Sequence, residues 1–379
     1  MSVTRIRAYI GPGNKDMFLS RVFGRPTPSH SASRQRALPR AIRVAALVGL
    51  LALGILGQPL QTPQAGTSQR GPRPEVSLST ESPGWDQALA AVLSAFDKAD
   101  VVALAASRGI AGSELRLRLI RHPDFPNKAR FIVVEWANSL YQPILDRYIQ
   151  GENVPLTELQ RVWRDQTQVG SWDSPIHAEF FTAVREINEK LPKAKQLRVL
   201  GGDPPIDWSK VHSRAEYGLF ADGERRDDSL VMIVRDQVLR GHGKALVIYG
   251  GAHFGGLQQS NPGRVFVVNI LGGSGPGYES LDKTLHSEQR PALLSLRGTP
   301  AGNVAANQFS WGARRFVQGK EVPLFPPTTT LGDLAHACFY FGHSVDVPGQ
   351  DPEPDPAIYA GTQYGAEILR RRQILNTKR

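Results

Sequence analysis

The most constraining feature of the sequence is a short apolar segment that runs directly into two glycines. Residues 245–249 (ALVIY) have the composition of a strand that is buried on both faces of a parallel sheet. Gly250 and Gly251 let the backbone turn sharply, and His253 follows at once. Ligands of open α/β sheets bind beyond the carboxyl ends of the strands. His253 is therefore either a site residue or a residue that caps the next helix, and this segment alone fits both interpretations.

Strand patterns of this kind alternate with helical patterns along much of the chain. Further strands are predicted at residues 100–104, 130–134, 197–200, 265–270 and 292–296. Between them, apolar residues recur at helical spacing, most clearly over 176–191. This alternation predicts an α/β fold, a single domain with a mostly parallel sheet flanked by helices on both faces. Beyond residue 297 the pattern weakens, and residues 330–341 are predicted to form another helix.

Composition divides the chain into five segments. These are a basic, disordered N-terminal segment (1–43), an uncharged apolar segment (44–57), a linker rich in Pro, Ser and Gln (58–84), the α/β domain (85–345) and an acidic, Pro-rich loop with a basic C-terminal helix (346–379). The basic helix is predicted to be a solvated surface element.

The apolar segment 44–57 predicts export. It is shorter than the roughly 20 residues of a spanning helix and has the length of a signal-peptide core. Arg40 and Arg43 precede it, as in the charged region of a leader. The segment is either a cleaved signal peptide or an N-terminal membrane anchor, which would be the chain's membrane contact. Either way, we expect the domain in the cell envelope or periplasm, or on the extracytoplasmic face of the membrane.

The distribution of charge argues against a nucleic-acid partner. The net charge is +10, but residues 1–43 hold nine Lys/Arg against one acidic residue, and residues 370–379 hold five and none. Residues 44–369 therefore carry 31 basic and 34 acidic side chains, a net charge of −3. No basic stripe is interleaved with aromatics, so we expect a small-molecule ligand. Cys338 is the one cysteine, and no histidine pair has zinc-site spacing, so no metal site is predicted.

Charged side chains follow four of the predicted strands. Arg108, Glu135, Asp203 and His253 each come at or after a strand end. Because the carboxyl ends of parallel strands meet at one edge of a sheet, these four side chains can face a common cleft. Glu135 and His253 would then form an acid/base pair that deprotonates a water or an alcohol near neutral pH.

Each of these residues also has a structural interpretation. Glu135 can form an ion pair with Arg108 without any chemistry. Asp203, which precedes two prolines, can be a turn or capping residue. Arg226 opens a predicted helix and either pairs with neighbouring acids on the surface or reaches the cleft as a ligand-binding residue.

Four motifs together resemble the superfamily of erythromycin esterase-like and ChaN/Tiki-like (haem-uptake) proteins. They are VVALAASRG (101–109), RFIVVEWA (130–137), LDRYIQGE (145–152) and LVIYGGAHF (246–254). The resemblance implies an α/β core with a G-E-x-H motif after the first strand, a Glu after the second and a G-x-x-H after a later one. In the esterase branch these residues serve hydrolysis of a macrocyclic ester by an activated water.

The resemblance carries over to Glu135 and His253 but fails at the first motif. Residues 105–108 read Ala-Ala-Ser-Arg where the superfamily has G-E-x-H. The two side chains expected to activate water are thus missing, and Arg108 suits an anion better than a proton transfer.

Three hypotheses follow from the sequence. In the first, the chain binds a small ligand, with anions among the candidates, through Arg108, Asp203 and Arg226, and its catalytic motif is degenerate. In the second, it is an active hydrolase of an ester-type small molecule that uses Glu135 and His253. In the third, suggested by the ChaN branch, it handles haem or a metal, with His253 and the nearby Tyr249 as the candidate ligands. The first two need no cofactor.

Overall fold

The computed structural model describes residues 80–106, 109–221, 223–309, 315–317, 320–322, 325–343, 345 and 359–376. The predicted N-terminal segments 1–43 and 44–57 lie outside these residues, as do most of the linker 58–84 and Arg108. Within the described part of the chain, no helix has both the length and the apolar character needed to cross a membrane.

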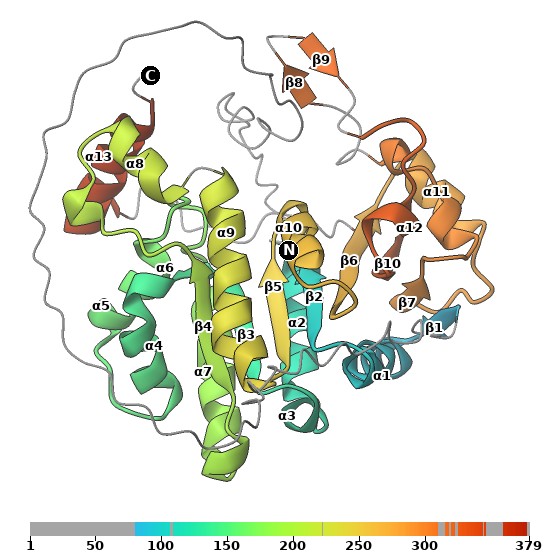
Figure 1. Cartoon of the computed structure of the whole chain (residues 1–379), viewed down its shortest axis with the longest axis horizontal. Coiled ribbons are helices and arrows are strands. Elements are labelled where there is room, and N and C mark those ends of the chain that lie inside the picture. Colours follow the sequence, from blue (N-terminus) through green and yellow to red (C-terminus); the bar gives the residue numbers. More distant parts are fainter. Residues whose placement is uncertain are drawn as a thin grey trace, which may run out of the picture. The chain divides into compact units, whose positions relative to one another are not determined.

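An eight-stranded sheet carries the fold (Figure 1). Its strands are β1 (Glu81–Pro83), β2 (Val101–Ala105), β3 (Phe131–Asn138), β4 (Arg198–Asp203), β5 (Ala245–Tyr249), β6 (Val265–Gly273), β7 (Ala292–Ser295) and β10 (Ala337–His343). They lie in the order β1-β7-β10-β6-β2-β5-β3-β4. Among these strands, β7 pairs antiparallel with β1 and β10, and the other five pairs are parallel. The sheet is therefore mixed, with a parallel part that contains every strand end of the predicted cleft.

Helices connect the strands, and a short hairpin of β8 (Arg315–Val317) and β9 (Lys320–Val322) lies outside the main sheet. The described α-helices are α1 (Trp85–Ser94), α2 (Ile110–Arg121), α3 (Phe125–Lys128), α4 (Gln142–Ile149), α5 (Leu156–Leu159), α6 (Arg161–Arg164), α7 (Pro175–Glu189), α8 (Arg214–Ala221), α9 (Gly223–Ile233), α10 (Phe254–Ser260), α11 (Pro276–Asp282), α12 (Leu331–Leu334) and α13 (Gln363–Asn376). The predicted strand at 245–249 coincides with β5, and the predicted helix at 176–191 corresponds to α7.

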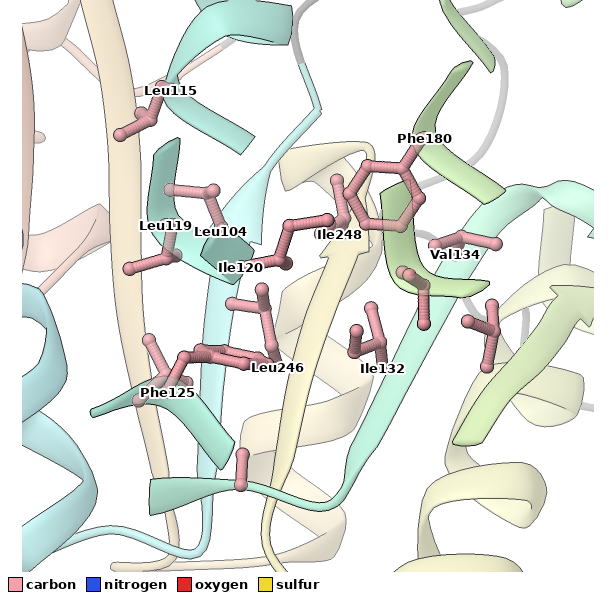
Figure 2. Packing of buried hydrophobic residues seen from close by; sticks show 14 of the residues in the cluster. Leu104, Leu115, Leu119, Ile120, Phe125, Ile132, Val134, Phe180, Leu246 and Ile248 are labelled. Carbon is pink, nitrogen blue, oxygen red and sulfur yellow. The ribbon is translucent and has the colours of Figure 1, made fainter. Parts of the chain in front are cut away.

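Alternating side chains of the central strands fill two separate cores. On β5, Leu246 and Ile248 pack into the core on the side of α2, α3 and α7, whereas Val247 and Tyr249 pack on the side of α9 and α10. Figure 2 shows the first core, in which strand residues Leu104, Ile132, Val134, Leu246 and Ile248 meet Leu115, Leu119, Ile120, Phe125 and Phe180 from the helices. Both faces of the sheet are thus covered, as the continuous apolar strand sequences indicate.

The C-terminal part differs from the sequence-based predictions. The helix predicted over 330–341 is wrong, because only α12 is helical and residues 337–343 form β10 between β6 and β7. Along β10, Phe339 enters one core while Cys338 and Tyr340 enter the other. That alternation with period two fits a strand buried on both faces, which periodicity alone does not distinguish from a buried helix.

Two further boundaries differ from the predictions. The structure places β1 at Glu81–Pro83, inside the predicted linker, so ordered pairing begins before Trp85. From the sequence, the Gly-rich segment at the end of β6 (residues 272–275) is expected to be a loop with no helix behind it, yet α11 begins at Pro276. A proline at the first helical position is a common helix start, because its missing N–H would have no partner there.

Candidate functional site

The site lies where β5, β3 and β4 end, three neighbouring strands of the parallel part of the sheet. Glu135 belongs to β3, Asp203 is the last residue of β4, and His253 follows β5. Arg226 reaches the same place from the first turns of α9. The structure thus brings together four of the five residues singled out in the sequence, and the fifth, Arg108, lies outside the described residues.

Glu135 is a buried carboxylate with hydrogen bonds to both oxygens. Alternation along β3 puts it on the α9 side with Val133, while Trp136 enters the opposite core. Its Oε1 accepts from Arg226 Nη2 at 2.5 Å and from Gln168 Nε2 at 2.8 Å. Its Oε2 accepts from the backbone N–H of Gly250 at 2.8 Å. Charge-assisted bonds of this kind hold a carboxylate in place.

Arg226 connects the other charged groups. Its side chain is 7% exposed, and its Nε lies 3.5 Å from Asp203 Oδ1. Its guanidinium also lies over the Tyr249 ring, 5.5 Å from the ring centre. Burial works against the charged form, but Tyr249, Glu135 and Asp203 together raise the pKa of Arg226 above its ordinary value. Arg226 is therefore a buried cation. The alternative interpretation, in which it pairs with neighbouring acids on the protein surface, is wrong.

His253 has a partner at each ring nitrogen. Its Nδ1 bonds Asp227 Oδ1, and its Nε2 lies 3.3 Å from Arg226 Nη1. A guanidinium offers only donors, so Nε2 must accept this bond. The network therefore assigns the neutral tautomer with the proton on Nδ1, which donates to Asp227. The Tyr249 ring meets the imidazole edge to face, with ring centres 5.1 Å apart, and fixes its plane.

Asp203 is fully buried on the other side of Arg226. It accepts two hydrogen bonds from Thr167, one from the backbone N–H and one from the hydroxyl, each at 2.6 Å. Burial raises the pKa of Asp203 to about 6, although Arg226 and Thr167 act in the opposite direction. Asp203 is thus neither a turn cap nor a solvated acid but a buried partner of Arg226.

The end of β2 contributes methyl groups at the positions where the superfamily that the sequence resembles has its G-E-x-H motif. The N–H of Ala106 donates to the Tyr249 carbonyl at 2.8 Å, which continues the pairing of β2 with β5. Ala105 and Ala106 pack against opposite cores. A glutamate at position 106, as in the G-E-x-H pattern, is absent, so this strand end supplies no carboxylate.

Three partners in the network escaped the sequence analysis. Asp227 was assigned to surface pairing on α9, and Gln168 and Thr167 lie in a connection without a recognisable motif. Asp227 directly follows Arg226 in the sequence. Their adjacency does not indicate that Arg226 bonds Glu135 while Asp227 bonds His253. Only the tertiary structure places residues 167–168 against β3 and β4.

The described residues offer little to a metal or haem. They contain no cluster of three or more His, Cys, Asp or Glu side chains arranged to hold a metal ion. Tyr249, considered with His253 as a haem ligand, is fully buried and donates its hydroxyl to the Gly202 carbonyl at 3.4 Å. His253 has both ring nitrogens engaged.

Comparisons with known proteins gave structural similarities only. No protein-family model and no curated protein matches the chain. One similar solved structure is a Bacillus cereus protein, at 11% identity and a TM-score of 0.42, with 70% of this chain and 95% of that one covered. Another is a histidine-to-asparagine mutant of the erythromycin esterase EreC in its open conformation, at 10% identity and a TM-score of 0.42, with 66% and 93% covered.

The burial of Asp203 predicts a specific dependence of stability on pH. The folded pKa of about 6 lies above the ordinary value of 3.8, so the folded state holds this proton longer than the unfolded state. The contribution of Asp203 to the free energy of unfolding is therefore greatest below pH 4. It is lost as the pH rises to about 6, by up to about 1.4 kcal/mol per pH unit. Urea unfolding of the wild type and Asp203→Asn at pH 4, 5, 6 and 7 should show the wild type losing stability relative to the variant over that window. Parallel pH profiles would contradict this assignment.

Proposed function

We propose that the chain is a small-molecule-binding protein that has the architecture of a hydrolase but no free water-activating base. One observation carries the proposal: at the site, each candidate base is already engaged. Glu135 is only 3% exposed and both of its oxygens accept hydrogen bonds, and Nε2 of His253 accepts from Arg226. A general base must have a lone pair within reach of the proton that it removes. Ala106, where the related proteins have a glutamate, supports the same conclusion.

The charges at the site favour a neutral or cationic ligand. Arg226 is the one cation of the described network. It contacts the carboxylates Glu135 and Asp203, and a third carboxylate, Asp227, bonds His253. With His253 neutral, the negative charge is not balanced. The side chain of Asp227 is 40% exposed and that of His253 is 12% exposed, so this pair is the part of the network that a ligand can reach.

Binding of an anionic ligand is a separate hypothesis, which depends on Arg108. Arg226 is enclosed by its own partners, since only 7% of its side chain is exposed and its guanidinium already contacts Glu135 and His253. It is therefore poorly placed as an anion clamp, and that role in the sequence-based hypothesis falls to Arg108 alone.

An active hydrolase is the second candidate, and the Asp227–His253 pair favours it. A carboxylate on Nδ1 orients an imidazole and stabilises the imidazolium that forms when Nε2 takes a proton. The bond from Arg226 to Nε2 is long, at 3.3 Å, and substrate binding could displace it. Glu135, bonded to Arg226 and to the Gly250 N–H, would then hold the groups around the imidazole in place.

We further propose, from residues 44–57 alone, that the protein is exported or anchored at the extracytoplasmic face of the membrane. The binding site would then meet small molecules of the cell envelope or the surroundings.

Hydrolysis of p-nitrophenyl butyrate separates the two candidates. The wild type should release nitrophenolate at the rate of buffer alone, because no base is free. Restoring the motif with Ala106→Glu and Arg108→His should raise the rate, by about 10² if one general base is regained. A wild type that hydrolyses the ester, and loses activity in His253→Ala but not in the control His212→Ala at an exposed position, would establish the second candidate instead.

Titration calorimetry with erythromycin tests the ligand class, since this macrocyclic ester carries an amine that is protonated at neutral pH. We expect the wild type to bind it and Asp227→Asn to weaken binding by about tenfold, the effect of one charge-assisted hydrogen bond. Asp228→Asn, at the exposed neighbouring position, is the matched control and should leave affinity unchanged. Binding of inorganic phosphate but not of erythromycin, lost in Arg108→Ala, would instead support the anionic ligand.

A further inference from the structure

The C-terminal helix α13 is packed into the domain and is not the solvated surface element that its basic sequence predicted. Ile368, Arg371 and Ile374 share one face of the helix at spacings of three residues, and each is at most 9% exposed. Ile374 joins a small apolar cluster with Trp208. Burying an arginine costs hydration free energy, which hydrogen bonds and ion pairs to the guanidinium must offset.

Arg371 finds these partners in the segment that leads to the site. Its Nη2 donates to Asp165 Oδ1 at 2.6 Å, and its Nη1 donates to the Arg164 carbonyl at 2.9 Å. Glu367, one turn earlier on α13, accepts from Arg371 Nε at 3.1 Å. The guanidinium also lies over the Trp208 ring, 4.9 Å from its centre. The fork of Arg371 therefore fixes both the backbone and the side chain at the start of residues 165–168.

Residues 165–168 form a direct connection between Arg371 and the site. Asp165 is at one end, bonded to Arg371. Thr167 holds Asp203 through two hydrogen bonds, and Gln168 holds Glu135. Both of those carboxylates contact Arg226. A shift of this segment would therefore change the partners of Arg226, and with them the position of His253.

Residues 165–168 also accept hydrogen bonds from other parts of the domain, and these bonds limit how the segment can move. The Asp165 carbonyl accepts from Asn138 Nδ2 at 2.7 Å, and the Tyr217 hydroxyl donates to the Thr167 carbonyl at 3.1 Å. These bonds come from β3 and α8 and involve no residue of α13. Loss of Arg371 should consequently loosen residues 165–168 without unfolding the sheet.

From these contacts we propose that Arg371 is a positioning residue for the site, acting through Asp165 and residues 165–168. The site itself is taken from the proposed function, but the connection from α13 to Glu135 and Asp203 rests on the contacts alone. A segment distant in sequence thereby sets the geometry of the ligand-binding network.

Amide hydrogen exchange of the full chain tests the proposal, with Arg371→Met compared with Arg370→Met. Arg370 is the matched control, because its two Nη donors bond the carbonyls of Val211 and Trp208 instead of residues 164–165. In Arg371→Met, the amides of Thr167 and Gly250 should exchange about tenfold faster or more, because their acceptors Asp203 and Glu135 move. In Arg370→Met, both should stay within about twofold of the wild type.

Equal acceleration in the two variants, or acceleration spread evenly over β2 and β5, would overturn the proposal, since either result would mean general destabilisation. If Arg371→Met does not fold, Asp165→Asn removes the same ion pair from the other side and should give the same local pattern. Erythromycin titration of the variants is read separately. A wild type that binds no erythromycin would count against the proposed function, and the exchange pattern would still decide the role of Arg371.

Discussion

The structure of the site depends on one buried cation. Arg226 contacts Glu135, Asp203 and His253, which come from three different strand ends. Removing a guanidinium from water is costly, and the cost is offset only when its charge and its N–H groups find partners. The carboxylates supply the charge, and they in turn need donors, which Gln168, Thr167 and the Gly250 backbone provide. The positions of all these groups are therefore coupled.

That coupling explains why the site contains acid/base residues whose lone pairs are already engaged by Arg226. A His–Asp pair and a buried glutamate at the carboxyl edge of a parallel sheet are the materials of acid/base chemistry. In this chain Arg226 stands between them and occupies lone pairs of both Glu135 and His253. With alanine at position 106, the first strand end offers no replacement base. On this basis we propose recognition of a ligand at Asp227 in preference to activation of water.

The parallel part of the fold could be predicted from sequence because its signals are local. The apolar run that is rich in β-branched residues predicts a strand with the same bounds as β5. The helical spacing of apolar residues predicts a helix that corresponds to α7. The juxtaposition of Glu135, Asp203 and His253 followed from parallel strands alone. β10 could not be predicted in the same way, since its aromatic residues are compatible with either element until β6 and β7 are known to flank it. Asp227, Gln168 and Arg371 were missed because their partners lie far away in sequence and no spacing rule connects them.

The central claim concerns the state of one imidazole, and ¹⁵N NMR of the His253 ring tests it directly. In the wild type we expect the proton on Nδ1, bonded to Asp227, and Nε2 as the acceptor of the bond from Arg226. In Arg226→Met, Nε2 should lose the shift of a hydrogen-bonded acceptor. A wild-type ring protonated at Nε2 would contradict the account, because Arg226 could not then donate to it and His253 would be free to exchange protons with a bound molecule.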